Sequence, residues 1–98
     1  MIFKGYVVAT KALMKSEGPV RFMYREEADG SDSGWRFFLG NEDEKYLSDP
    51  EHIGIYDITS ILAIDPTIEE YLGNGPWVAY ERDENGSFIE VHDFWPGH

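Results

Sequence analysis

Short runs of the chain alternate apolar and polar residues, which is the pattern of β-strands that bury one face. Residues 6–10 (YVVAT) are β-branched and aromatic and predict a first strand. Residues 20–25 (VRFMYR) place Val20, Phe22 and Tyr24 on one face of a half-buried strand, with Met23 on the other. Further strands are predicted at residues 35–39, 53–58, 77–81 and 87–91.

Two other segments carry helical signals. Residues 59–71 have apolar side chains at three- and four-residue spacings, but the pair Asp65-Pro66 divides them. Asp65 is a candidate cap for the second part, with Pro66 at the first helical position, where the missing N–H costs little; alternatively, Thr67 with Glu70 could form a capping box. Residues 11–16 predict a helical turn that stops before Gly18-Pro19. Residues 41–52 are polar, and Pro50 argues against a long helix there.

The connections predict hairpins. The pair Asn85-Gly86 lies between two strand patterns and supplies the positive φ angles of a tight turn. Residues 26–34 have no apolar side chain larger than alanine and predict a long, mobile loop between two paired strands. We therefore expect one α+β domain over residues 1–98. Its sheet should be mainly antiparallel, with about five or six short strands and one or two short helices packed on one face.

The composition narrows the possible partners. Nineteen Asp and Glu against eight Lys and Arg give a formal charge of −11. A surface of this sign repels nucleic acid and anionic membranes and attracts basic proteins, at a rate that falls as salt rises. The chain has no cysteine, no signal-peptide pattern and no run near the roughly 20 apolar residues of a membrane span. We expect a cytoplasmic protein that binds another protein; its oligomeric state stays open.

Candidate catalytic chemistry is sparse. The histidines (His52, His92 and His98) are dispersed, so an enzyme requires His52 or His92 to lie beside a carboxylate in a cleft. The acids of residues 29–34 lack the spacing of a calcium loop, and the consecutive acids of residues 42–44 diverge from one another in a helix or strand. We expect no catalytic residue, no metal and no cofactor.

The densest feature is an acidic band, because nine of the nineteen acids fall within residues 26–51. Crowding like charges costs stability, which a basic partner would relieve, although a merely solvated surface is the simpler alternative. The leading hypothesis is a protein-binding face of charged contacts and aromatic anchors, formed by Glu26, Glu27, Trp35, Arg36, Glu42, Asp43, Glu44 and Tyr46. The second hypothesis is a small-ligand or accessory domain, in which Trp35 and Trp77 line a pocket beside Arg36. Tryptophans within strands are also typical core residues.

Several segments together resemble a bacterial family, the immunity protein 33-like domain. The matching pieces are Val7-Val8-Ala9-Thr10-Lys11, Phe22-Met23-Tyr24-Arg25-Glu26, Asp32-Ser33-Gly34-Trp35-Arg36-Phe37, Gly40-Asn41-Glu42-Asp43-Glu44, Ile55-Tyr56-Asp57, Asp65-Pro66 and Glu81-Arg82. The resemblance covers nearly the whole chain. It implies a small, non-enzymatic α+β protein that protects a bacterial cell by binding a toxin domain, and it carries over no catalytic residue.

Overall fold

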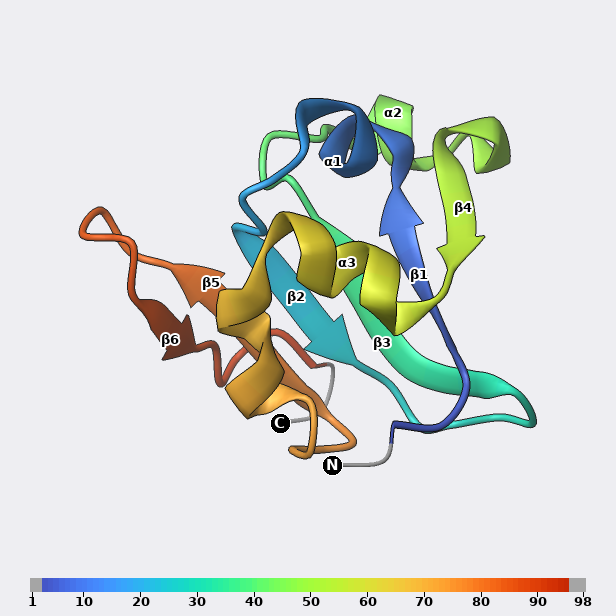
Figure 1. The fold of residues 1–98 in the computed structure, drawn as a ribbon. Coiled ribbons are helices and arrows are strands. Elements are labelled where there is room, and N and C mark those ends of the chain that lie inside the picture. Colours follow the sequence, from blue (N-terminus) through green and yellow to red (C-terminus); the bar gives the residue numbers. More distant parts are fainter. Residues whose placement is uncertain (1–2, 96–98) are drawn as a thin grey trace.

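The computed structural model describes residues 3–95, which form a six-stranded sheet with short helices (Figure 1). The strands are β1 (Tyr6–Thr10), β2 (Phe22–Arg25), β3 (Asp32–Phe38), β4 (Ile53–Tyr56), β5 (Val78–Arg82) and β6 (Phe88–Glu90). The helices are α1 (Lys11–Ser16), α2 (Glu44–Leu47) and α3 (Ile58–Ile64), with the 3-10 helices η1 (Pro50–His52) and η2 (Pro66–Tyr71). The predicted α+β class is confirmed.

The strand order is β4-β1-β3-β2-β5-β6, and β1 with β3 is the one parallel pair in the described sheet. After β1, helix α1 carries the chain to β2, and the β2–β3 hairpin then inserts β3 between β2 and β1. Thr10 caps α1, since its hydroxyl accepts from the backbone N–H of Leu13 at 3.2 Å. Strand β3 is therefore central, with a neighbour on each side.

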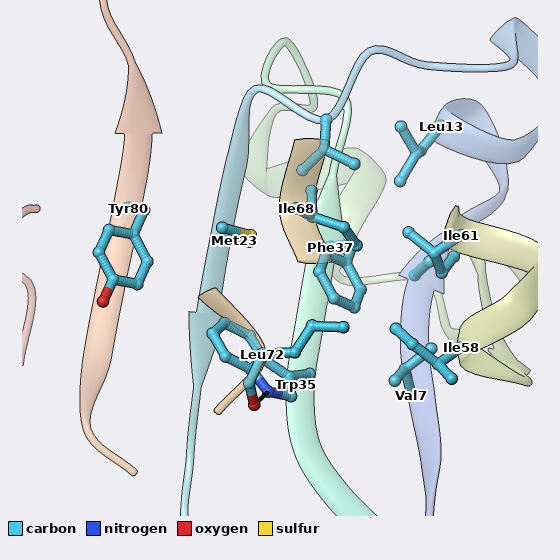
Figure 2. Close-up of a cluster of buried hydrophobic side chains, with 12 residues drawn as sticks. Val7, Leu13, Met23, Trp35, Phe37, Ile58, Ile61, Ile68, Leu72 and Tyr80 are labelled. Atoms are coloured by element: carbon cyan, nitrogen blue, oxygen red, sulfur yellow. Dashed lines mark hydrogen bonds between the residues drawn. The ribbon is translucent and has the colours of Figure 1, made fainter. Parts of the chain in front are cut away.

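The hydrophobic core lies between the sheet and the helices α1, α3 and η2 (Figures 1 and 2). Trp35 and Phe37 of β3 stack at 5.8 Å and are fully buried. The indole N–H of Trp35 donates to the backbone carbonyl of Leu72 at 3.1 Å, so a polar contact fixes the ring against the end of η2 (Figure 2). Figure 1 shows α3 crossing the same face of the sheet.

The break at Asp65-Pro66 appears where the sequence predicted it. Helix α3 ends at Ile64, and Asp65 caps η2 by accepting from the backbone N–H of Thr67 at 3.1 Å. The break lets both helices bury an apolar side chain against one sheet face, Ile61 from α3 and Ile68 from η2. No helix among residues 3–95 is long and apolar enough to cross a membrane.

The predicted alternation of Phe22, Met23 and Tyr24 is present in β2, and the helices cover the Met23 face. Met23 is fully buried in the core, and Phe22 and Tyr24 lie on the opposite face of the sheet, where they contact the ring of Phe94. Both faces of this strand carry large apolar side chains, so the alternation alone did not show which one meets the helices. Val20 is buried as well, but it precedes the strand.

The β2–β3 connection is shorter than predicted. Strand β3 begins at Asp32, and Asp29 pairs with Asp32 through two backbone hydrogen bonds of 3.0 Å around the turn Gly30-Ser31. Gly34 has a φ of 92°, and a side chain there would overlap the backbone carbonyl of Glu26. The N–H of Glu26 donates to the carbonyl of Gly34 at 2.9 Å. Backbone pairing therefore extends the hairpin into a segment that composition had assigned to a loop.

The predicted β5–β6 hairpin is present, with a turn that differs in detail. Gly86 takes a positive φ of 85°, and its N–H donates to Asp83 at 3.0 Å. The carboxylate of Asp83 accepts from the N–H groups of Asn85 and Ser87, each at 2.9 Å. This is the three-residue loop with one left-handed glycine, whereas the prediction required positive φ at both residues of the pair.

Candidate functional site

The sheet face opposite the helices carries a concavity of about 700 Å³. We call it the open-face concavity, and its central lining residues are Val8, Phe22, Tyr24, Arg36, Phe38 and Phe94. Leu47 of α2 and Ile53 of β4 close it on one side, and the C-terminal segment closes it on the other. The concavity forms because no helix covers the centre of the sheet on this face, while these two segments flank it.

Aromatic rings form most of the apolar lining. Tyr24 stacks on Phe38 with ring centroids 5.6 Å apart. The ring centroid of Phe94 lies 5.0 Å from that of Tyr24 and 5.4 Å from that of Phe22, and the residue remains 38% exposed. Three of these rings stand on neighbouring strands β2 and β3, so the sheet backbone holds them in place. Rigid, partly exposed aromatic groups are the usual anchors of protein interfaces.

Arg36 lies at the wall of the concavity and is held by two carboxylates. Its Nη1 and Nη2 donate to the two oxygens of Asp32 at 2.8 and 2.7 Å, and its Nε donates to Glu26 at 3.1 Å. The hydrogen bond from Arg36 holds the pKa of Asp32 below its ordinary range, and the same bond raises the pKa of Arg36. The group of three side chains therefore carries one net negative charge.

Tyr24 stands beside this group. Burial raises the pKa of its phenol, Glu26 raises it further, and Arg36 opposes them. The hydroxyl therefore stays protonated at neutral pH and can both donate and accept a hydrogen bond.

Glu42 serves the fold. Its carboxylate accepts from the Thr10 hydroxyl at 2.5 Å and from the backbone N–H groups of Leu39 and Gly40 at 2.8 and 2.7 Å. Burial raises its pKa, but these hydrogen bonds lower it more, so the net shift is downward. Glu42 thus ties the end of β3 to the start of α1, with few lone pairs left for a partner.

The neighbouring predicted residues build the short helix α2. Asp43 caps it by accepting from the N–H of Tyr46 at 2.7 Å, and Glu44 lies exposed in its first turn. The Tyr46 hydroxyl accepts from the N–H of Ala12 at 3.0 Å, and its ring stacks on His52 at 4.0 Å. Asp43 and Glu44 are both exposed, but the Asp43 carboxylate is engaged as the helix cap.

The acidic band of the sequence does not form one patch. Glu26 and Glu27 precede β3, and residues 42–44 follow it, so the seven residues of β3 separate the two groups. Figure 1 shows the β2–β3 connection and α2 at opposite ends of that strand. Between them, on the open face, lies the concavity. The predicted acids therefore flank an aromatic site, one group at each end.

The predicted tryptophan pair does not line a pocket beside Arg36. Trp35 is 0% exposed on the core face, where Arg25 of the neighbouring strand lies 5.7 Å above its ring. Arg36, the next residue in the strand, points to the other face. Trp77 is 47% exposed and packs edge-on against Trp95 at 5.1 Å. Trp35 is thus a core residue and is unavailable as an anchor for a partner.

The histidine geometry that an enzyme would require is not met at either described candidate. His52 lies 3.8 Å from Asp49, beyond hydrogen-bond distance, and its other ring nitrogen contacts the carbonyl of Tyr46. The His92 side chain is 81% exposed and lies 3.7 Å from Glu90. His98 lies outside the described residues. Among residues 3–95, no group of three or more metal-ligating side chains converges on one point.

Sequence reasoning missed the open-face aromatics. The alternation placed Phe22 and Tyr24 together on one face of a strand, but it did not show that no helix covers this face, and Phe38 carried no separate signal. The available signal was that β2 and β3 carry large apolar side chains on both faces, although a single layer of short helices covers only one.

Comparison with known proteins gives one match. The model of a family described as the immunity protein Imm33 domain matches residues 7–92. No curated protein and no solved structure matches. The matched range includes every strand and helix described above except Tyr6, the first residue of β1.

Proposed function

The chain belongs to the Imm33 immunity protein domain family, and on that premise we propose that it protects a bacterial cell by binding a toxin domain directly in the cytoplasm. The observation that carries this proposal is the open face, where a partly exposed aromatic concavity lies between two acidic groups. Such a face combines apolar anchors at the centre with charges at the rim, which is how protein interfaces are commonly built.

The charge of the chain favours a basic toxin. At a formal charge of −11, long-range attraction would raise the association rate of a basic domain, and salt would reduce that rate. A toxin that binds nucleic acid carries a basic cleft for phosphates, and an acidic protein seated there would block its substrate. Glu27 and Glu44, one at each end of β3, are the exposed acids best placed to supply this attraction.

A protein that inhibits a toxin by occupying its substrate cleft needs no catalytic residue of its own. The polar groups near the concavity mostly bind each other: Arg36 binds Asp32 and Glu26, and Glu42 binds Thr10. A general base or nucleophile needs a free lone pair aimed at a substrate. These groups instead hold the fold, so we propose a non-enzymatic role.

A second candidate function is the binding of a small molecule in the same concavity. Its volume of about 700 Å³ lies within the range of small-molecule sites. The internal pairing of Arg36 and Glu42 leaves few polar groups to orient such a ligand, which makes the protein partner the stronger proposal.

The test is co-expression of the tagged protein with the product of the adjacent gene, followed by pull-down at low and at high salt. We expect a toxin-like domain to be retained at low salt and retained in smaller amount at high salt, and we expect deletion of the protein to make the cell sensitive to that toxin. If the neighbouring product is not retained at either salt concentration and deletion leaves competition between strains unchanged, the proposal is wrong.

A further inference from the structure

We infer that the open-face concavity receives an arginine side chain that projects from the toxin. This inference rests on the proposed function and deepens it, because it names the chemistry of the contact.

The charges around the concavity favour a cation. Arg21, Arg36, Arg82, Glu42 and Glu81 contribute to its lining. Two of the three arginines are already paired, Arg36 with Asp32 and Glu26, and Arg82 with Asp65. When these paired carboxylates are counted with the lining, the whole set carries two net negative charges. An incoming cation therefore meets an attractive local field within a strongly acidic protein.

The aromatic lining favours a planar cation over a compact one. Tyr24 and Phe38 stack with an interplanar angle of 19°, and Phe94 stands beside them, partly exposed. A guanidinium stacks on aromatic faces and loses less hydration than an ammonium, so arginine fits such a site better than lysine.

Two acceptors near the rings remain available for its N–H donors. Glu26 binds Arg36 through Oε2, and no hydrogen bond to its Oε1 is found among the described residues. The phenol of Tyr24 stays protonated and can accept. Glu81, exposed at the rim, adds a further carboxylate. A bound guanidinium would thus have rings on its faces and oxygens at its edge.

A second copy of this chain fits the site less well. Two chains of charge −11 repel each other, and contact between their open faces would bring like acidic ends together. An anion meets the same unfavourable field. The basic protein segment is therefore the occupant that the charges select.

The inference can be tested without the toxin. The ¹⁵N-labelled protein is titrated with acetyl-Arg-Arg-amide and, as a neutral probe of similar size, with acetyl-Gln-Gln-amide. We expect saturable shifts in β2 and β3 for the arginine probe, with a Kd on the order of 1 to 10 mM, and no saturable shifts for the glutamine probe. Phe38→Leu should weaken binding about two- to fivefold through loss of stacking. Arg21→Gln should strengthen it by removing a like charge.

The control variant is Glu69→Gln, which removes an exposed acid from η2 on the helical face. It should bind the arginine probe like the unchanged protein. The spectrum of each variant first establishes that it is folded. The inference is overturned if the shifts grow linearly and stay in the acidic loops, if acetyl-Gln-Gln-amide binds equally well, or if Phe38→Leu weakens binding no more than Glu69→Gln.

The same variants separate this inference from the proposed function. If the neighbouring toxin binds unchanged protein and Phe38→Leu equally tightly, the toxin role stands and the concavity is not its anchor. If no toxin binds, the proposed function fails. The inference then fails as well, even if acetyl-Arg-Arg-amide binds the protein saturably. Loss of toxin affinity in Phe38→Leu, with none in Glu69→Gln, supports both.

Discussion

The substitution Asp65→Asn should destabilise the protein more than the same exchange at an aspartate on the exposed surface. The Asp65 residue is 5% exposed and accepts four hydrogen bonds. Val20 donates its backbone N–H at 2.9 Å, Arg82 donates from Nη2 at 2.8 Å, and Thr67 donates both its N–H and its hydroxyl. This one carboxylate links the segment before β2, the helix η2 and the strand β5.

Asparagine has one carbonyl oxygen where aspartate has two acceptors. If that oxygen faces Val20 and Arg82, the new NH₂ group points at the N–H of Thr67, and if it faces Thr67, the two other donors lose their acceptor. Breaking a buried ion pair by removing one partner costs about 3 to 5 kcal/mol. Because asparagine keeps part of the network, we expect a loss of about 3 kcal/mol in the free energy of unfolding. That is a large share of the about 5 to 15 kcal/mol typical of a domain.

The loss should depend on pH in a defined direction. Burial raises the pKa of Asp65, but hydrogen bonds from Thr67, Val20 and Arg82 together lower it more. A carboxylate with a lowered folded pKa stabilises the fold above its ordinary value of 3.8, and that contribution disappears as the pH falls through the folded pKa. The difference between Asp65→Asn and the unchanged protein should be constant near neutrality and shrink in acid below that value.

The assay is urea denaturation followed by circular dichroism across this pH range. Asp57→Asn is the matched control, since Asp57 is exposed and its side chain makes no capping hydrogen bond to α3, and it should change stability by less than about 0.5 kcal/mol. A double-mutant cycle with Arg82→Gln should give a coupling of at least about 1 kcal/mol. If Asp65→Asn costs no more than Asp57→Asn, or if its cost grows in acid, the assignment of a buried, charged Asp65 is refuted.

Three further outcomes follow from the contacts described. Glu42→Gln should lower the free energy of unfolding by about 1 to 3 kcal/mol, because it weakens three hydrogen bonds to a charged acceptor. Glu44→Gln, at an exposed position nearby, should leave that free energy unchanged, and chemical denaturation of both variants compares them. Trp35→Phe should lower the denaturation midpoint, with a cost of about 2 to 4 kcal/mol, because it leaves a gap and removes a donor to Leu72; an unchanged midpoint would contradict its core role. Glu27→Gln with Glu44→Gln should slow toxin association about two- to fivefold at low salt and have little effect at high salt, as stopped-flow kinetics would show; equal slowing at both would exclude steering.

The segments that resemble the family contain several of the polar contacts that hold this fold together. Asp32 with Arg36, Glu42 with Thr10, and Asp65 with Arg82 each join residues of the matching pieces. Glu42 illustrates the consequence, because as a member of an acid cluster it was a candidate partner contact, and three hydrogen bonds assign it to the fold. Of the predicted acids, Glu27 and Glu44 remain freely displayed.

Local patterns were sufficient for the elements of this protein. The strand at residues 6–10, the division of the helical segment at Asp65-Pro66 and the hairpin around Asn85-Gly86 all depend on neighbouring residues, and the structure has each of them. Charge, the absence of cysteine and the family resemblance likewise needed only the sequence. These properties are set within a few residues or by composition, so no knowledge of distant contacts is required.

Tertiary structure alone decided which face of each strand became the core and which residues share a site. Strands alternate with a period of two, so Met23 and Tyr24 were equal candidates for burial until the helices covered one face. Strand order then put Asp65 beside Arg82, separated the acids by the length of β3, and gathered Tyr24, Phe38 and Phe94 around one concavity. Each of these is a pairing between distant positions, which a linear pattern does not encode.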